Sequence, residues 1–516
     1  MAKFKPYDYD QMVMIPISLK EQLDPGTLEY AIHELVEQKI ELSVFEDRFK
    51  NDDSGAPAFD PKILLKIILF AYSRCMVGSR PIERACRENI IFMALSCGFQ
   101  PDHSTIAHFV SSMKDEIESI FCNVLLVCEE LNLLGGTHFS LDGLKLPSNA
   151  SKEWSGTFKE LKKKQDKLQE KLTEVLSEHI RTDDSSESDS QRREKQKARL
   201  ERQVKRLDEF LKQNHPKQGK TKAEIQSNVT DNESAKMPTS HGVIQGYNAQ
   251  ALVDDKHQII INAGAMGNGQ DHDNLKPMLE GAKKNMQVIG KGEDYFKGKQ
   301  LSADSNYHNK SNLAICEEEG INAYIPDPQF RKRDVLFADQ ARFKDGINPR
   351  KRVKKSVRNQ KVFTNDDFTW DEKTQCYICP NDKLIKLKAR AQQIRNYVYD
   401  MYRAREADCS ACPLRLKCLS TPKTQARYVL IRIDDSPEEK KKTSLVEQMK
   451  AKIDTPEGRK IYSKRLAIVE PVFANIRAQK RLDRFTLRTK KKVNIQWMLF
   501  ALVHNIEKIA NFGGAY

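Results

Sequence analysis

Three acidic side chains, Asp142, Asp304 and Glu470, stand in surroundings that could place them in one catalytic site. Asp142 follows THFSL and Asp304 follows QLSA, two short stretches that alternate like strands, so we predict that each aspartate ends a strand. In open α/β sheets, functional sites gather at the carboxyl ends of strands. Glu470 is the one acid of the segment YSKRLAIVEPVFANIR. Three carboxylates brought together by a fold could hold divalent cations at a phosphodiester.

The proline that follows Glu470 shapes the helix that we predict around it. Proline is best tolerated in the first turn of a helix, so we expect a helix that starts or kinks at Glu470 and continues to about Arg488. Two helical turns separate Glu470 from Arg477, which would bring both side chains to one face. The simpler interpretations are a surface carboxylate at Glu470 and a turn residue at Asp142.

The composition favours a globular protein with a polyanionic partner. The chain has 516 residues, 39% of them hydrophobic and 31% charged, which is enough for roughly two to four domains. Its net charge of +14 favours nucleic acid over a membrane as the partner. The first residues contain no apolar signal segment, and the longest apolar run, Ile63 to Tyr72, is too short to span a bilayer. We therefore expect a cytoplasmic protein.

Residues 1–134 have the pattern of several short helices joined by tight turns. Pro61 and Pro81 lie near predicted helix starts, and Asp102 or Ser104 is suited to cap a third helix. We interpret this region as a helix-turn-helix-like DNA-binding domain, and an ordinary helical bundle is the alternative. The first side chains to test for phosphate or base contacts are four arginines: Arg74, Arg80, Arg84 and Arg87.

Residues 135–328 combine predicted strands and helices with a charged insertion. Between about residues 154 and 215, two segments carry leucine and valine at gaps of three, four and seven residues, which predicts an antiparallel helical hairpin. A charged face that packs against nothing is the alternative. The remaining strands alternate with helices, one of them begun by Asp271 to Asn274, and so indicate an α/β fold.

Residues 329–455 are basic and rich in cysteine. Five of the eleven cysteines have C-x2-C and C-x2-C-x5-C spacings here. In a chain without a signal segment, this clustering suggests a metal site rather than disulfides. Tetrahedral zinc needs four soft ligands, and unliganded thiols are the alternative. The predicted zinc ligands are Cys379, Cys409, Cys412 and Cys418, with Cys376 as the substitute.

Several segments together resemble the bacterial insertion-sequence transposases of the DDE type, in the IS-four-like superfamily. They are SLDGLKLPSNAS, GYNAQALVD, LSADSNYHN followed by INAYIPD, the cysteine-bearing insertion, YSKRLAIVEPVFANIR and HNIEK. GFQPDHSTIAHF is also similar to the helical DNA-binding region of that family. The resemblance extends nearly from end to end. It implies an RNase H-like α/β catalytic domain, interrupted by an insertion before the final acid and completed by residues 456–516.

The resemblance also implies roles for particular residues. The catalytic triad would be Asp142, Asp304 and Glu470, which would hold two Mg2+ or Mn2+ ions. The Tyr, Arg, Glu, Lys signature of the superfamily would correspond to Tyr462, Arg465, Glu470 and Arg477, with Tyr462 and both arginines at the DNA phosphates. This chain departs from the signature twice. Its last basic residue is arginine, and the gap from Arg465 to Glu470 is one residue longer than in the general pattern.

The partners that the resemblance implies are double-stranded DNA, both as terminal inverted repeats and as target, and a second copy of the chain. Two protomers are normally needed to pair two transposon ends. The protein would then be bacterial and associated with the nucleoid. Two other functions are a non-catalytic DNA-binding repressor or scaffold and a metal-dependent nuclease without strand transfer. Loss of an acid would indicate the repressor, and all three acids are present.

Overall fold

The computed structural model describes most of the chain as two compact units. The described residues are 18–48, 57–114, 116–181, 187–219, 223–239, 242–334, 363–394, 397–419, 424–433 and 437–514. The first unit comprises residues 1–328 and 455–516, and the second comprises residues 329–454. The first unit is therefore built from both ends of the chain. The most basic part of the predicted insertion, residues 335–362, lies outside the described residues.

Short helices make up the first part of unit one. They are η1 (Lys20–Gln22), α1 (Leu28–Glu34), η2 (Leu35–Lys39), η3 (Ser43–Arg48), α2 (Pro61–Ser73), α3 (Ser79–Glu88), α4 (Ile90–Leu95), α5 (His103–Ser112) and α6 (Glu116–Glu130). Local capping sets their starts: Asp60 accepts a hydrogen bond from the backbone N–H of Lys62 (2.8 Å), and Asp102 accepts one from Thr105 (2.6 Å). Helix α2 is buried from Leu64 to Tyr72 and forms the centre of this helical region.

A mixed sheet forms the centre of the same unit. Its strands are β1 (His138–Pro147), β6 (Ala235–Thr239), β7 (Gly242–Asp254), β8 (Ile260–Met266), β9 (Gln300–Ala303) and β10 (Asn322–Tyr324), in the order β10-β9-β1-β7-β6 with β8 also paired to β7. Strand β1 is antiparallel to β7 and parallel to β9, which is parallel to β10. Parallel neighbours need a crossover, and helix α10 (Lys310–Glu318) supplies it between β9 and β10.

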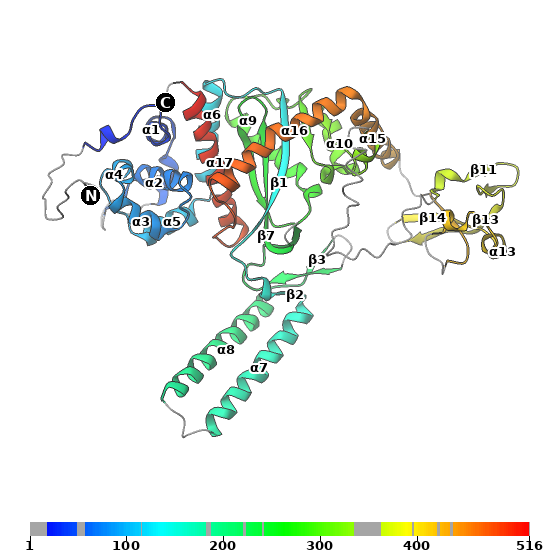
Figure 1. Cartoon of the computed structure of the whole chain (residues 1–516), viewed down its shortest axis with the longest axis horizontal. Helices are drawn as coiled ribbons and strands as arrows, with labels where there is room; N and C mark the ends of the chain where they lie inside the picture. The colour runs from blue at the N-terminus through cyan, green and yellow to red at the C-terminus, as the bar shows by residue number, and fades with distance from the viewer. Residues whose placement is uncertain are drawn as a thin grey trace, which may run out of the picture. The chain divides into compact units, whose positions relative to one another are not determined.

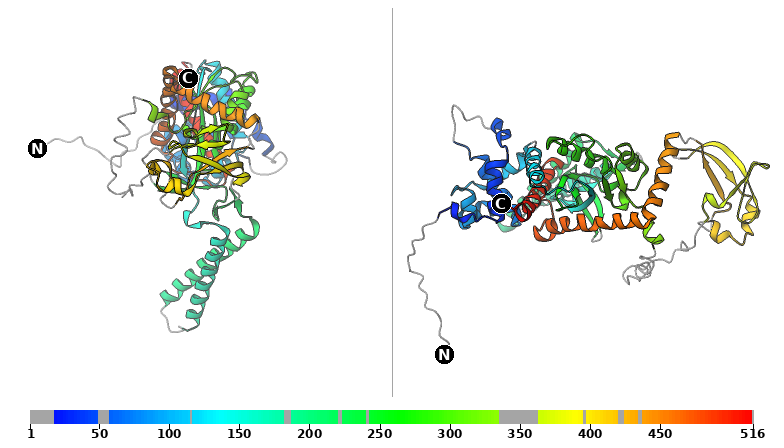
Figure 2. Two further views of the ribbon diagram at one scale, coloured as in Figure 1. Left: turned by 90° about the vertical axis from the view of Figure 1, so that its right-hand side faces the viewer. Right: turned by 90° about the horizontal axis from the view of Figure 1, so that it is seen from above.

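Helices from distant parts of the chain cover the sheet. Helix α9 (Leu275–Val288) and helix α17 (Lys490–Phe512) both contact β8. Helix α17 also contacts α2 and α6, so the last helix joins the sheet to the N-terminal helices, as Figures 1 and 2 show. Every residue from Ile495 to Ile506 is buried. A helix buried on all sides belongs to the core.

The helix that carries Glu470 is α16 (Pro456–Ala474), and it begins well before Glu470. Thr455 caps it by accepting a hydrogen bond from the N–H of Gly458 (3.0 Å), and Pro456 occupies the first turn. Of the two predicted alternatives, a helix start or a kink at Glu470, the start is therefore wrong. The helix continues as the π-helical η10 (Asn475–Gln479) and ends there rather than near Arg488.

Pro471 lies inside α16, and a side chain from another element compensates for it. Proline has no N–H to donate to the carbonyl of Ala467, one turn earlier. The side chain of Gln258 donates to that carbonyl instead, with an Nε2 to O distance of 3.0 Å. The helix therefore passes through the proline with this carbonyl satisfied.

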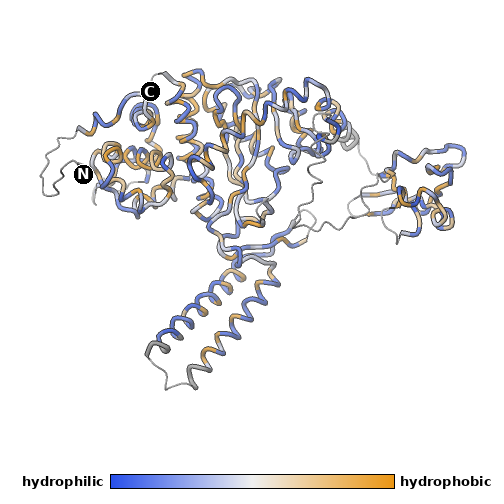
Figure 3. The backbone as a smooth tube through the Cα atoms, in the orientation of Figure 1, coloured by the Kyte–Doolittle hydropathy of each residue, from blue (hydrophilic) through white to orange (hydrophobic). Residues whose placement is uncertain are grey.

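The charged insertion forms two long helices, α7 (Phe158–Arg181) and α8 (Glu187–Gln213), which pack along one another. Figure 3 shows that both are mainly hydrophilic. Of the predicted repeat, Leu161 and Leu207 are buried in one cluster with Phe210 and Val229, and Leu168 and Leu211 pack against this cluster. Two small ladders lie next to the helices in sequence: β2 (Ser155–Gly156) with β5 (Ser227–Asn228), and β3 (Lys217–Gln218) with β4 (Glu224–Ile225).

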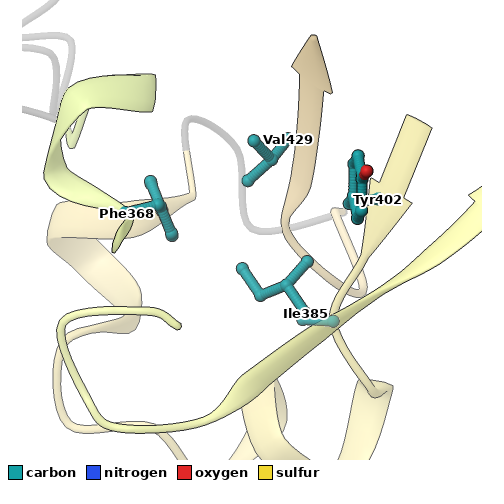
Figure 4. Close-up of a cluster of buried hydrophobic side chains, with 5 residues drawn as sticks. Phe368, Ile385, Tyr402 and Val429 are labelled. Atoms are coloured by element: carbon teal, nitrogen blue, oxygen red, sulfur yellow. The ribbon is translucent and has the colours of Figure 1, made fainter. Parts of the chain in front are cut away.

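The second unit has its own sheet and a small core. Its elements are α11 (Phe330–Arg333), η9 (Asn365–Asp367), β11 (Thr369–Asp371), β12 (Cys376–Ile378), β13 (Leu384–Ile394), β14 (Tyr397–Arg403), α13 (Glu406–Ser410), α14 (Arg415–Cys418), β15 (Tyr428–Arg432) and α15 (Pro437–Asp454). The five strands are paired in sequence order. Phe368, Ile385, Tyr402 and Val429, drawn in Figure 4, form the core together with Ala404.

The chain is thus of mixed α/β class, as its sequence predicts. None of the described helices combines the length and apolar character needed to cross a membrane.

Candidate active site

Asp142 lies within a strand and not at its end. Strand β1 pairs with β9 as far as Leu141, and with β7 as far as Pro147. The prediction that the strand ends at Asp142 is therefore wrong, because pairing with the long strand β7 carries β1 further. Asp142 is the first residue of β1 beyond its pairing with β9, at the point where that side of the strand opens.

Asp304 directly follows β9, as the sequence predicts. Leu141 and Ala303 are partners in the parallel ladder, so the next residue on each strand is an aspartate. The Asp304 carboxylate begins the short helix η6 (Ser305–Tyr307) by accepting hydrogen bonds from the N–H and the hydroxyl of Ser305. Both aspartates line one pocket of about 590 Å³. Strand register therefore brings together two of the three predicted acids.

A cation and a backbone amide hold the Asp142 carboxylate. Its Oδ2 lies 2.7 Å from Nη1 of Arg465, and its Oδ1 accepts a hydrogen bond from the N–H of Gly143 (2.8 Å). Burial raises the pKa of Asp142, the charge of Arg465 opposes this rise, and the charge of Asp304 adds to it. Burial and the charge of Asp304 therefore disfavour the charged form of Asp142, and a bound cation would favour it.

Of the predicted phosphate-binding residues, Arg477 lines this pocket and Arg465 pairs with Asp142, one of its lining residues. The Arg465 side chain is only 9% exposed, and its buried Nε has no hydrogen-bond partner among the described residues. The Arg465 guanidinium lies 5.9 Å from the ring centre of Tyr462. Arg477, in η10, is exposed and lines the pocket with the two aspartates. The arginines therefore approach the acids from the α16 side.

Glu470 does not join the two aspartates. Its side chain is exposed, it is absent from the lining of the pocket, and no hydrogen bond or ion pair links it to another described residue. Glu470 follows Arg465 by five residues, which turns it about 140° around the helix from the direction of Arg465. Because Arg465 faces Asp142, Glu470 faces elsewhere in this conformation.

Three of the N-terminal arginines share a surface of helix α3. Arg80, Arg84 and Arg87 are exposed and spaced about one turn apart. Arg87 pairs with Glu83 on the same helix (2.6 Å). Arg74 lies at the end of α2, where its guanidinium sits 5.0 Å from the ring centre of Phe70. The exposed side chains of Arg80, Arg84 and Arg87 are therefore accessible to a polyanion.

The predicted zinc ligands gather beside the core of unit two. Three of them pack against that core: Cys379, Cys409 and Cys418. Burial raises the pKa of Cys418, and the nearby thiols of Cys409, Cys412 and Cys379 add to the rise. The substitute ligand, Cys376, instead donates its thiol to the carbonyl of Thr374 (3.2 Å).

Sequence reasoning missed a third acid at the pocket, Asp271, which it assigned only to a helix start. Asp271 begins η5 (Asp271–Asp273) and lines the pocket with Asp142 and Asp304. Burial raises the pKa of Tyr307 far above its usual range, and the charges of all three aspartates contribute. Asp271 lies in a short 3-10 helix between β8 and α9, where no periodic sequence pattern indicates which side chain faces the pocket.

A divalent cation would find two suitable ligands here. Among the described residues, no group of three or more histidine, cysteine or acidic side chains is placed to hold a metal ion. Mg2+ commonly binds one or two carboxylates, while waters and substrate phosphates complete its shell. Asp142 and Asp304, which supply hard oxygen atoms at one pocket, fit that requirement.

Two family models match the chain. Residues 17–112 match the model described as Transposase domain (DUF772), which covers most of the N-terminal helices. Residues 378–510 match the model described as Transposase DDE domain, which includes Arg465, Glu470 and Arg477. No curated protein matches the chain. The two domain matches together indicate that the chain is an insertion-sequence transposase of the DDE type.

Proposed function

We propose that this transposase binds the terminal inverted repeats of its insertion sequence, cuts the DNA there and joins the freed strands to a target. The observation that carries this proposal is the meeting of Asp142 and Asp304 at one pocket, with Arg465 and Arg477 beside them. An RNase H-like core is supported by the mixed sheet, in which β1 pairs antiparallel with β7 and parallel with β9.

Asp142 and Asp304 would hold Mg2+ or Mn2+. When bound, such cations activate the attacking water or 3′-hydroxyl and stabilise the leaving oxygen. Arg465 and Arg477 would bind and orient the scissile phosphate. The Arg465 guanidinium pairs with Asp142 in this structure, and a phosphate oxygen that accepts from the guanidinium would draw it from that carboxylate. DNA binding would then free the carboxylate oxygen that a cation needs.

Glu470 would be the third acid of a triad that holds two ions, as in the family that the chain resembles. The geometry supports Glu470 less than the aspartates, because its side chain is exposed and outside the pocket. Tyr462, whose ring lies near Arg465, would contact the same stretch of DNA. Glu470 needs a test separate from that of the aspartates.

Other parts of the chain would supply DNA affinity and assembly. Arg80, Arg84 and Arg87 would contact DNA phosphates or bases from α3, and two protomers would pair the two ends of the element. Cys379, Cys409, Cys412 and Cys418 would hold a structural zinc ion beside the small core of unit two. Metal analysis of the purified protein should then find about one zinc per chain. A zinc-free protein of unchanged stability would leave these cysteines as thiols.

The proposed function can be tested with a supercoiled plasmid that carries both ends of the element, incubated with Mg2+. We expect cutting at the ends by the wild type and by Asp273→Asn, whose acid lies in η5 but not in the pocket lining. We expect none from Asp304→Asn, with binding to end DNA retained in a gel-shift assay. Equal cutting by all three proteins would show that cleavage does not need Asp304 and would contradict the proposed aspartate site.

A second assay separates transposition from simple hydrolysis. Labelled, pre-cut ends are incubated with target plasmid, and covalent joining of the 3′ ends is measured. Cutting without joining would make the protein a metal-dependent nuclease. End binding with neither reaction would make it a repressor or scaffold.

A further inference from the structure

Two buried amides occupy the space beside the residue that follows Asp142. Gly143 pairs with Gln250 across the sheet. A Cβ atom on Gly143 would lie 2.0 Å from Nε2 of Gln250 and 2.6 Å from Oδ1 of Asn248, so a larger residue would have to displace these amides. Both amide side chains are completely buried, and Gln250 Nε2 donates to Asn248 Oδ1 (2.9 Å). The amide side chains of β7 thus occupy the space that a side chain after Asp142 would need, and a glycine stands there.

The same amides converge on Asp271. Its Oδ1 accepts hydrogen bonds from Asn248 Nδ2 (2.6 Å) and from Gln250 Nε2 (3.1 Å). Asp271 is only 8% exposed. Burial of a carboxylate costs free energy unless strong donors replace water, and these amides supply them. Two hydrogen bonds from buried amides therefore hold the Asp271 carboxylate at the pocket.

Asn306 connects Asp271 to Asp304. Its Nδ2 donates to Oδ2 of Asp271 (3.2 Å) and to Oδ2 of Asp304 (3.2 Å). A carboxylate can only accept, so the amide cannot turn its oxygen toward either acid without losing both bonds. The other oxygen of Asp304 already accepts from Ser305. Asp271 thus fixes the amide that fixes Asp304.

We propose that Asp271 is a positioning residue which, through Asn306, orients the Asp304 carboxylate for cation binding. This inference rests on the proposed function of Asp304. A ligand that hydrogen bonds already orient does not have to be ordered when the cation binds. Loss of such an outer partner typically weakens metal affinity about 10- to 100-fold. In this proposal Asp271 acts only through Asn306 and is not itself a cation ligand.

The test compares Asp271→Asn, Asn306→Ala and the double variant, with Asp273→Asn as the matched control. For each protein, the Mg2+ concentration that gives half-maximal end cleavage is measured. Mn2+ binding to the DNA-free protein, followed by calorimetry, gives a readout independent of activity. The Tm reports folding. Asn306 is exposed, so Asn306→Ala decides the question if Asp271→Asn does not fold.

If Asp271 acts through Asn306, both single variants raise the half-maximal Mg2+ concentration and weaken Mn2+ binding by at least about 10-fold. The double variant is no worse, because both changes break one chain of contacts. Two outcomes would overturn the inference: a lower Tm with unchanged metal dependence, or fully additive effects of the two changes. Asp304→Asn separates this inference from the proposed function. Full cleavage by Asp304→Asn would reject the proposed site itself, whereas an inactive Asp304→Asn beside a normal Asp271→Asn would reject only the role of Asp271.

Discussion

The sheet side and the helix side of the proposed site are held in different ways. On the sheet side, strand register places Asp142 and Asp304 together, and hydrogen bonds from Gly143, Ser305 and Asn306 hold their carboxylates. On the helix side, Glu470 is exposed on α16 and does not line the pocket that the aspartates share. Carboxylates on paired strands are thus organised before a ligand arrives, whereas an acid on a helix surface depends on the helix rotating or moving toward the site.

Glu470→Gln provides the largest expected effect and the most direct challenge to this comparison. A lost cation ligand removes several kcal/mol of transition-state stabilisation, so we expect end cleavage to fall on the order of 10³-fold. Cleavage rates are compared at saturating Mg2+. Glu457→Gln, which changes an exposed acid in the first turn of α16, should retain its rate. If Glu470→Gln is as active as the control, the catalytic acids lie on the sheet side alone.

Arg465→Met tests the contact that joins the two sides. Arg465 of α16 pairs with Asp142 of β1 at 2.7 Å, and the side chains are only 9% and 20% exposed. Removing one partner leaves a charge poorly solvated, so we expect the free energy of unfolding to fall by about 3 kcal/mol, measured in urea at neutral pH. Adding Asp142→Asn removes that stranded charge and should restore part of the loss. An equal loss in single and double variants would contradict the pairing.

His504, in helix α17, predicts how acidic pH lowers the stability of the helices that pack against the sheet. Its ring nitrogens contact the carbonyl of Gln258 (2.9 Å) and Oδ1 of Asn475 (3.1 Å). Burial lowers the pKa of His504 from 6.5 to about 3. Between these values the unfolded chain binds a proton that the folded chain does not. Stability should therefore fall as the pH drops below 6.5, by about 1.4 kcal/mol per pH unit from this group.

The check is the decrease in unfolding free energy from pH 7 to pH 5 in the wild type and in His504→Gln. The glutamine variant keeps a donor for the Gln258 carbonyl but cannot take up the proton, so its decrease should be smaller. Equal decreases in both proteins would show that His504 does not carry the acid sensitivity.

Gln258→Ala should have the smallest effect. It removes the donor that satisfies the Ala467 carbonyl opposite Pro471, and one such hydrogen bond contributes about 1 kcal/mol to the free energy of unfolding. In a Pro471→Ala background, the restored backbone N–H can bond to Ala467, so Gln258→Ala should then cost less. The same cost in both backgrounds would mean that Gln258 acts by another route.

Features set by neighbouring residues could be predicted from the sequence. Pro61 stands at a helix start and Asp102 caps another helix as predicted, and β9 has the predicted bounds from Gln300 to Ala303. The transposase resemblance is supported by two family models. In each case the signal lies within a short segment, because a cap, an alternation or a motif depends on nearby residues.

The tertiary structure decided how those segments meet. Strand pairing, which no local pattern specifies, extends β1 past Asp142 and sets Asp142 beside Asp304. The side chain of Gln258 allows α16 to continue through Pro471. The role of Asp271 could be inferred only from the fold, in which Asn248 of β7 and Asn306 after β9 donate hydrogen bonds to its carboxylate. Hydrogen bonds between distant segments depend on relative position in space, and residue type and spacing alone do not determine that position.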